Sequence, residues 1–576
     1  MTAEPHYYLG NSTVVEPLIN NWAAWGHLIP PVTYSLHLQR YQVPLLESFV
    51  RHPKIHVQAC ANPELRYGPF VSIPPQRSHA VRELLNTTKA AQRENLEFAD
   101  SIAGFSNYLT QSAKGESLDP YYERMPKALG GLVELVYDYM HRPTVRFIEG
   151  LVYESPYYRR DLQSLRLFRL GRDGSRPFFM STPRLPEVGQ VDWAEPFESR
   201  KVDELFALDK SPKQLGYIRE LLGQRAGDDQ NLIPLFSEAG PSGGNGWDGA
   251  GIRLRYIDHA CVLVEYNGIS ILTDPWIPVA PADGGPERVT YRDLPEKIDF
   301  ALVTHAHPDH LCLESLLRLR NRIGCLVTHR PMGMLYGDFS VKLLAKKIGF
   351  KNVIDLDTFE AVGFPDGEIV ATPFLGEQAD LAHGKTAYVV RAGSHQMMFG
   401  ADSNCLDRRI YQNIRQAVGP IQTVFIGMEC VGAPLSWMYG PLMASKLDNN
   451  LDQSRRLVGC NAARAMEMCE AVGASRVYVY AMGLEPWLEY LLGLAVSDDS
   501  IQMKESRLLA AQALERGFVD ARILRGPTDI YISEVSASAS VSGANLWVQA
   551  AAPALFGDRH ICKGAIGPDA TSGESA

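Results

Sequence analysis

The chain has 576 residues and a net charge of -10, with 45% hydrophobic and 21% charged residues. Its length predicts more than one domain, and its composition is that of a folded globular protein, which excludes wholesale disorder and a membrane bundle. The negative charge disfavours a general nucleic-acid or anionic-membrane binder.

The compartment is predicted from the N-terminus and the cysteines. The first residues lack a basic region followed by an apolar one, so we expect no secretory signal. The nine cysteines are scattered and include no Cys-x-x-Cys pair, which argues against a disulfide framework and a zinc ribbon. We therefore expect a cytoplasmic protein.

Residues 1–236 are predicted to form an α/β domain. Apolar residues recur at helical spacing over 75–109 and again over 121–151, whereas 165–170 is typical of a strand. No titratable residues group at motif spacing here, so we expect a role in dimerisation or in covering a substrate. A Gly-rich linker follows at 237–251, where six of fifteen residues are glycine.

Residues 252–536 are predicted to form a second domain, followed by a tail at 537–576. Two β-rich runs, 261–266 and 269–274, are separated by Asn267-Gly268, a strong hairpin signal. Strands then alternate with helices, which suggests two sheets covered by helices. The fold class is therefore α/β (α+β).

A cluster of potential metal ligands follows an apolar strand at 300–304. Four of them, His305, His307, Asp309 and His310, fall within six residues. In a strand-to-helix loop, the first two histidines share one face and can hold one metal ion, while the last two residues are displaced toward a second. The motif predicts a dinuclear metal site.

This His-x-His-x-Asp-His motif, together with the earlier run Ile271-Leu-Thr-Asp-Pro-Trp276, resembles the metallo-β-lactamase superfamily. The resemblance implies an αββα sandwich with two metals at one edge, and it gives Asp274 the role of orienting a ligating histidine. His259 is interpreted as a packed or capping residue rather than a ligand.

The chain departs from the hydrolases of that superfamily where they place two further histidines. Glu377 follows the strand at 368–373, where the third histidine is expected, and Glu429 ends a later strand in place of the last one. Asp402, at the end of a Gly-x-Asp strand, matches the bridging aspartate. An alternative has His383 as the third histidine, which would restore a hydrolase-like site.

The charge of this ligand set decides which chemistry it favours. Four carboxylates cancel the four positive charges of two divalent metal ions, so the site is a poorer electrophile than a histidine-rich one. Oxygen-rich ligands favour iron and stabilise its higher oxidation states. Oxygen activation therefore becomes more probable than hydrolysis.

These departures, the large N-terminal domain and the Gly-Met-Glu-Cys strand end resemble the metallo-β-lactamase-fold di-iron β-hydroxylases of antibiotic biosynthesis, such as that of chloramphenicol biosynthesis. The resemblance implies a monooxygenase that uses an oxo-bridged cluster of two iron ions, O2 and an external electron donor to hydroxylate an amino acid. That substrate would be tethered to the carrier domain of a nonribosomal peptide synthetase. The ligands it implies are His305, His307 and Glu377 for one iron, and Asp309, His310, Asp402 and Glu429 for the other, with Glu377 and Asp402 as the catalytic pair.

Three functions remain open from the sequence: this oxygenase, a di-zinc hydrolase of a phosphoester, lactone or thioester, and a metal-stabilised binding module. The partners expected for the oxygenase are the carrier domain, a reductase or electron-transfer protein, and a second copy of the chain. Basic clusters at 318–322, 346–347 and 408–409 are candidate docking faces for an acidic carrier domain.

Overall fold

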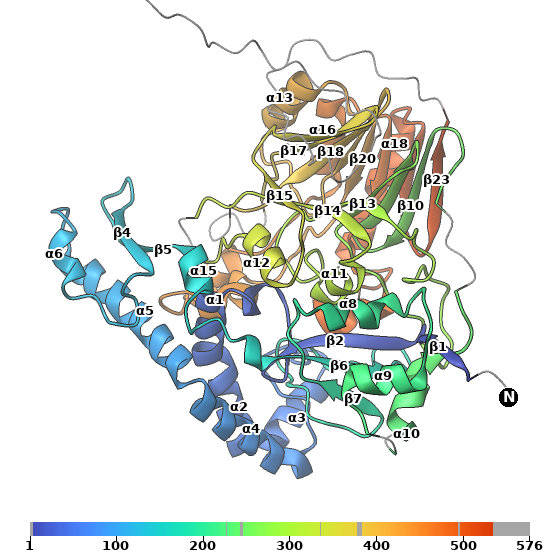
Figure 1. Cartoon of the computed structure of the whole chain (residues 1–576). Helices are drawn as coiled ribbons and strands as arrows, with labels where there is room; N and C mark the ends of the chain where they lie inside the picture. Colours follow the sequence, from blue (N-terminus) through green and yellow to red (C-terminus); the bar gives the residue numbers. More distant parts are fainter. Residues whose placement is uncertain are drawn as a thin grey trace, which may run out of the picture.

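A computed structural model describes residues 4–225, 227, 229–241, 246–333, 336–376, 383–493 and 496–533. Figure 1 shows two regions that follow each other along the chain and pack together. The expected tail at 537–576 and Glu377 lie outside the described residues. Among the helices of the described ranges, none is long and apolar enough to cross a bilayer.

The N-terminal region combines a four-stranded antiparallel sheet with helices, as predicted. The sheet has the order β3-β2-β6-β7, formed by β2 (Thr13–Ile19), β3 (Trp22–Ala23), β6 (Gln163–Arg169) and β7 (Gln190–Trp193). A second, three-stranded sheet has the order β8-β1-β9, formed by β1 (His6–Leu9), β8 (Lys213–Gln214) and β9 (Phe236–Ser237). The main helices are α1 (Pro31–His37), α2 (Val43–Arg51), α3 (Pro53–Ala61), α4 (Ser78–Ala91), α5 (Arg93–Ser112), α8 (Arg200–Ala207) and α9 (Leu215–Leu222).

The helix predicted over 121–151 is wrong. The structure has instead a hairpin of β4 (Val133–Tyr137) and β5 (Pro143–Phe147), flanked by α6 (Asp119–Tyr122) and α7 (Glu149–Tyr153). Val133, Leu135 and Val145 are buried on one face of the hairpin, while β-branched residues and Pro143 disfavour a helix there.

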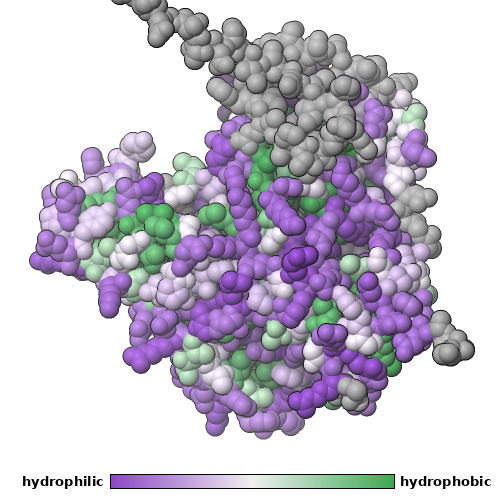
Figure 2. All heavy atoms as spheres, viewed as in Figure 1, coloured by the Kyte–Doolittle hydropathy of each residue, from purple (hydrophilic) through white to green (hydrophobic). Residues whose placement is uncertain are grey.

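This hairpin belongs to a lobe that projects from the molecule (Figure 1) and carries exposed apolar side chains (Figure 2). Tyr139 and Met140 at its tip are 105% and 73% exposed. Tyr122, Ile148 and Leu151 are also exposed. Exposed apolar residues gathered on one lobe are typical of an interaction surface.

The second region contains two seven-stranded sheets. The first has the order β15-β14-β13-β12-β11-β10-β23, with β10 (Ile252–Asp258), β11 (Cys261–Tyr266), β12 (Ile269–Thr273), β13 (Ile298–Leu302), β14 (Ile323–His329), β15 (Val353–Leu356) and β23 (Thr528–Ile532). The second runs in chain order from β16 to β22, with β16 (Ala361–Phe364), β17 (Gly367–Thr372), β18 (Ala387–Ala392), β19 (His395–Phe399), β20 (Thr423–Ile426), β21 (Arg476–Val479) and β22 (Asp520–Ile523).

Helices cover the outer faces of both sheets, which confirms the predicted sandwich. One core lies between the sheets and includes Phe300 and Phe399. A second lies between the later sheet and α13 (Arg408–Val418), α16 (Ala462–Val472) and α18 (Ile501–Glu515). A third core joins α11 (Leu313–Leu319) and α12 (Val341–Lys347) to the N-terminal region, so the two regions pack as one body.

Two sequence signals set the register of the first sheet. Asn267 and Gly268 both have positive φ, 48° and 73°, and join β11 to β12 in the predicted hairpin. The strand β13 then pairs in parallel with β12 and β14, while β19 pairs in parallel with β20 in the other sheet. Parallel strands bring their carboxyl ends to one edge, and that edge holds the metal motif.

The basic cluster at 318–322 is not a docking face. Arg318 is buried and donates to the carboxylate of Asp209 from Nη2 at 2.6 Å and from Nε at 2.8 Å. Arg320 is also buried and donates to Asp203 at 2.8 Å from its Nε. The cluster lies on and just beyond α11, which packs against α8, so these cations hold the two regions together rather than facing a partner.

Glu149 supplies a pH-dependent contact between the two regions. Its carboxylate accepts a hydrogen bond from the backbone N–H of Ser340 at 2.9 Å. Burial, together with the nearby charge of Asp338, raises the pKa of Glu149 from 4.5 to about 7. The folded protein thus retains this proton where the unfolded chain has lost it, so the site costs stability as pH rises from 4.5 through 7.

We expect Glu149→Gln to remove that cost. The variant should melt roughly 1 to 3 °C above the wild type at about pH 8.5, where Glu149 is charged, and by a much smaller margin at about pH 4.5, where Glu149 is neutral in the folded state and only half charged in the unfolded chain. Scanning calorimetry at the two pH values measures the effect. A difference in Tm that did not change with pH would contradict the assigned cause.

Candidate metal centre

The four residues of the motif lie in the loop that follows β13. His305, His307, Asp309 and His310 are all buried, although each of these four polar side chains loses hydration on burial. The loop then leads into α11. Burial of so many polar side chains in one loop requires partners that compensate their lost solvation.

Asp274 holds the loop from the end of the neighbouring strand β12. Its Oδ1 accepts from the backbone N–H of Thr304, and its Oδ2 accepts from the Thr304 hydroxyl, both at 2.8 Å. The same Oδ2 lies 2.8 Å from Nδ1 of His310. Asp274 thus fixes the ring of His310 so that Nε2 faces the centre, as the sequence predicted for this residue.

Asp402 reaches the centre from the end of β19. The turn requires positive φ at Ala401 (45°), whose N–H donates to the hydroxyl of Tyr480 at 3.0 Å. Gly427, after β20, leaves the carboxylate room, because a Cβ at that position would lie 3.0 Å from Oδ1 of Asp402. The Gly-x-Asp and Gly-Met-Glu strand ends therefore fit each other sterically.

The side chains form two groups that could each hold a metal ion, with their ligand atoms within 4.8 Å of one another. These groups are His305, His307 and Asp402, and His259, Asp309 and His310. Oδ2 of Asp402 lies 3.5 Å from Nε2 of His305 and 3.1 Å from Nε2 of His310. Asp402 thus contacts both groups, which is the position of a bridging ligand.

The donor set fits two cations. Nε2 of His305 and Nε2 of His310 are buried and form no hydrogen bond within the described ranges. Burial disfavours a charged His310 ring, yet Asp402 and two further carboxylates raise its pKa well above the ordinary value. Protons therefore occupy places that metal ions would take over on binding.

Glu429 belongs to the same charged centre. Burial and the nearby carboxylates of Asp402 and Asp309 raise the pKa of Glu429 to about 8. Like His310, it retains a proton that a metal ion would displace. The structure thus brings five of the seven predicted ligands into the two groups, with Glu429 as a charged neighbour of both, and Glu377 lies outside the described residues.

His383, the alternative third histidine, is exposed at the start of the segment after the gap. Its backbone carbonyl accepts from Lys385 at 2.8 Å. It is absent from both groups of candidate ligands that the described residues form. His383 therefore contributes no ligand atom to either group in the described part of the chain.

The sequence did not predict that His259 lies at the metal centre. This buried residue lies in the tight turn between β10 and β11 with a positive φ of 44°. Its Nε2 lies 2.9 Å from Oδ2 of Asp309. The sequence carries no motif spacing for this contact, because the turn meets the loop only through the order of the strands.

The N-terminal region also contributes to the wall of the centre, which the sequence did not reveal. A Cβ on Gly26 would lie 3.3 Å from the carbonyl oxygen of Ala306, within the metal motif. The buried His27 ring lies 5.5 Å from that of Tyr439, whose hydroxyl is 3.0 Å from Nε2 of His307. This domain therefore lies against the metal loop.

We expect Asp274→Asn to weaken metal binding by about 10- to 100-fold, the usual loss when the partner of a ligating histidine is changed. An asparagine has one acceptor oxygen where three donors now converge. Metal titration of the two proteins measures the loss. Asp299→Asn is the control, because Asp299 is a buried aspartate at the other end of β13 that accepts from Ser270. Equal metal affinities of the two variants would contradict this role of Asp274.

Comparison with known proteins agrees with this geometry. The diiron non-heme beta-hydroxylase N-terminal domain family matches residues 8–240, and the beta-lactamase superfamily domain matches residues 270–480. The 4-amino-L-phenylalanyl-[CmlP-peptidyl-carrier-protein] 3-hydroxylase of Streptomyces venezuelae is 34% identical over 90% of this chain and 98% of its own. A UPF0173 metal-dependent hydrolase of Caldivirga maquilingensis is 34% identical over 21% of this chain and 48% of its own.

The fold has a similar counterpart among solved structures. The crystal structure of CmlA, a diiron beta-hydroxylase from Streptomyces venezuelae, matches with a TM-score of 0.85 and 31% identity. The match covers 92% of this chain and 100% of that one. It extends over both regions, so the N-terminal domain and the sandwich keep the same arrangement in the two proteins.

Proposed function

Because this chain belongs to the family of diiron non-heme beta-hydroxylases, we propose that it hydroxylates the β-carbon of an amino acid held as a thioester on a carrier domain. The carrier domain would be part of a nonribosomal peptide synthetase in antibiotic biosynthesis. Support comes from the Streptomyces venezuelae relative, whose name gives a carrier-protein-bound aminoacyl substrate and which aligns over 98% of its length. The reaction would consume O2 and electrons from an external donor.

The observation that carries this proposal is the carboxylate-rich centre. We assign His305, His307 and Glu377 to one iron and Asp309, His310 and Glu429 to the other, with Asp402 between them. Such oxygen-rich ligands suit iron that changes oxidation state. Bound iron would supply the reductive activation of O2 at this centre.

The other residues around the centre position its ligands and exclude water. Asp274 orients His310, and His259 holds Asp309 from the opposite side. The rings of Trp25 and His27 stack with centroids 4.7 Å apart over the metal loop. An aromatic wall keeps bulk water from a reactive oxidant, which would otherwise be lost to side reactions.

We propose that the electrons come from another protein. The eight cysteines of the described ranges are all free thiols, and the sequence shows no dithiol or iron-sulfur motif. We propose a separate reductase or electron-transfer protein as the donor. The same free thiols support our expectation that the enzyme works in the reducing cytoplasm.

The decisive test uses a carrier domain loaded with candidate amino acids. With reductant and O2, we expect the carrier-bound amino acid to gain the mass of one oxygen atom, and no gain without either reagent. Metal analysis of the protein purified without added metal should give two irons per chain. Two zincs per chain and cleavage of the thioester would instead establish the di-zinc hydrolase.

We also propose that the projecting lobe mediates a homodimer. The tip residues Tyr139 and Met140 expose an apolar surface that a second copy could bury. Replacing both by serine should convert a dimer to a monomer in sedimentation analysis. The same change at Leu514, an apolar side chain exposed on α18, is the control. Dimers that persist in the lobe variant would contradict this assignment.

A further inference from the structure

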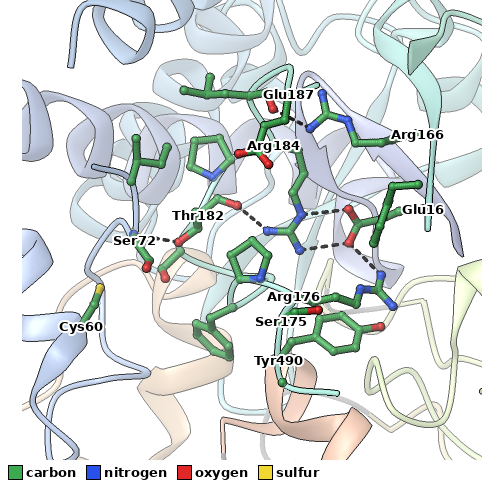
Figure 3. A pocket seen from close by; sticks show the side chains of 18 of the residues that line it. Glu16, Cys60, Ser72, Arg166, Ser175, Arg176, Thr182, Arg184, Glu187 and Tyr490 are labelled. Atoms are coloured by element: carbon green, nitrogen blue, oxygen red, sulfur yellow. Dashed lines mark hydrogen bonds and ion pairs between the residues drawn. The ribbon is translucent and has the colours of Figure 1, made fainter. Parts of the chain in front are cut away.

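A cavity of about 490 Å³ lies between the N-terminal region and the segment that carries Glu489 and Tyr490. Six arginines line it: Arg66, Arg77, Arg166, Arg169, Arg176 and Arg184. Figure 3 shows Arg184 at its centre, with Glu16 on one side and Thr182 on the other. The cavity is separate from the metal centre, since none of the described candidate ligands lines it.

The lining of this arginine cavity is positive, although the chain carries a net charge of -10. Six guanidinium groups face three lining carboxylates, those of Glu16, Glu187 and Glu489. Two more carboxylates, Asp192 and Glu314, pair with Arg166 and Arg176 from behind the wall. The exposed Arg169 pairs with no side chain of the described ranges, so one positive charge remains for a ligand.

Three buried polar atoms of the lining also lack a hydrogen-bond partner within the described residues. They are the hydroxyl of Ser181, Oε1 of Gln190 and Nε of Arg176. Ser181 is only 1% exposed, so bulk water does not satisfy it. Leaving such groups unpaired is costly, which indicates a ligand that offers both acceptor oxygens and an amide donor.

The fixed part of the cavity is already organised. Arg184 is buried and donates two hydrogen bonds to the carboxylate of Glu16, at 2.9 Å from Nε and at 3.0 Å from Nη2. Its Nη1 donates to the carbonyl of Thr182. Burial opposes ionisation of Glu16, but Arg184 and Arg176 together lower its pKa to about 2. The guanidinium groups therefore keep their positions and charge before any ligand arrives.

One end of the cavity approaches the metal centre. Phe178 lines the cavity and packs against Trp437, with ring centroids 6.0 Å apart. Trp437 lies in α14 (Leu435–Tyr439), whose last residue contacts His307 through its hydroxyl. Phe178 and Trp437 therefore connect the wall of the cavity to the helix that contacts the metal motif.

We propose that the arginine cavity binds the phosphodiester and the adjoining amides of the phosphopantetheine arm of the carrier domain. This inference rests on the proposed function, since it names where the tether of that substrate lies. The phosphate oxygens pair with the positive charge of Arg169 and accept a hydrogen bond from the Ser181 hydroxyl. An amide N–H of the arm donates to Oε1 of Gln190. The thioester end then extends toward His307.

The test compares 4′-phosphopantetheine with pantetheine, which lacks the phosphate, by calorimetric titration of the iron-loaded full-length enzyme. We expect the phosphorylated compound to bind about tenfold more tightly, as one charge-assisted contact would give. Arg169→Glu should remove this preference, and Ser181→Ala should weaken it about fivefold. Arg169→Glu should also raise KM for the carrier-bound substrate about tenfold.

Arg172→Glu is the matched control, because Arg172 is exposed three residues along the chain and does not line the cavity. Equal affinities for the two compounds, or identical binding by the two arginine variants, would overturn the assignment. Inorganic phosphate that competes at the same concentration as 4′-phosphopantetheine would indicate a free-phosphate site and would overturn it too. Phosphate-dependent binding by a protein that never hydroxylates a loaded carrier would leave the cavity assigned and refute the proposed function instead.

Discussion

An Asp402→Ala protein is expected to bind fewer than two irons per chain and to hydroxylate more than about 100-fold more slowly. This loss exceeds the roughly 10- to 100-fold typical of a residue that only orients a ligand. The reason is its position. Oδ2 of Asp402 lies 3.1 Å from Nε2 of His310 and 3.5 Å from Nε2 of His305, so one substitution affects both ligand groups. Iron content and oxygen incorporation into the loaded carrier measure the effect.

Asp407→Ala provides the control for this substitution. Asp407 lies five residues later, is exposed, and caps α13 by accepting from the backbone N–H of Arg409 at 2.9 Å. Its loss should cost about 1 kcal/mol of stability and leave iron content and turnover unchanged. Full iron occupancy in Asp402→Ala would mean that another group bridges the metals.

The part of the centre that lies at strand ends could be predicted from the sequence. Local patterns gave the Asn267-Gly268 hairpin and the apolar strand before His305, and both are confirmed by the structure. Parallel pairing of β12 with β13 places Asp274 beside the motif, whereas Asp402 ends β19 in the other sheet and meets the motif through the packing of the two sheets.

The contacts that the sequence did not predict depend on packing between distant segments. His259 meets Asp309 across 50 residues, and His27 reaches Tyr439 from a different domain. Neither pair has a spacing that a local pattern could reveal. Arg318 is an example of a wrong prediction with the same cause. Its sequence neighbours suggest an exposed basic face, but it is buried and pairs with Asp209, which lies far away in the chain.

The helix expected over 121–151 failed for another reason. Apolar residues at intervals of three and four also satisfy the alternation of a short strand, so the period alone does not separate the two structures over so few residues. Pro143 and the β-branched residues around it favour the hairpin of β4 and β5 over a helix. The result is a projecting lobe where the sequence suggested a packed helix.

The strongest test of the oxidative chemistry concerns Glu377 and His383. In the proposed ligand set Glu377 completes one iron, whereas the hydrolase alternative gives that place to His383. The structure describes His383 as exposed and outside both ligand groups of the described residues. We therefore expect Glu377→Ala to lose iron and hydroxylation to below about 1% of the wild type, and His383→Ala to retain both.

A third variant separates the charge of the ligand from its mere presence. Glu377→His keeps a ligand but raises the charge of the bimetallic site by one unit, which makes it a better Lewis acid and a poorer host for oxidised iron. We expect its metal content, measured by mass spectrometry after expression with both metals, to shift from iron toward zinc while hydroxylation stays lost. If instead His383→Ala lost its metal and Glu377→Ala kept full iron and activity, an imidazole would close the site, and the carboxylate-based preference for iron would no longer explain the chemistry.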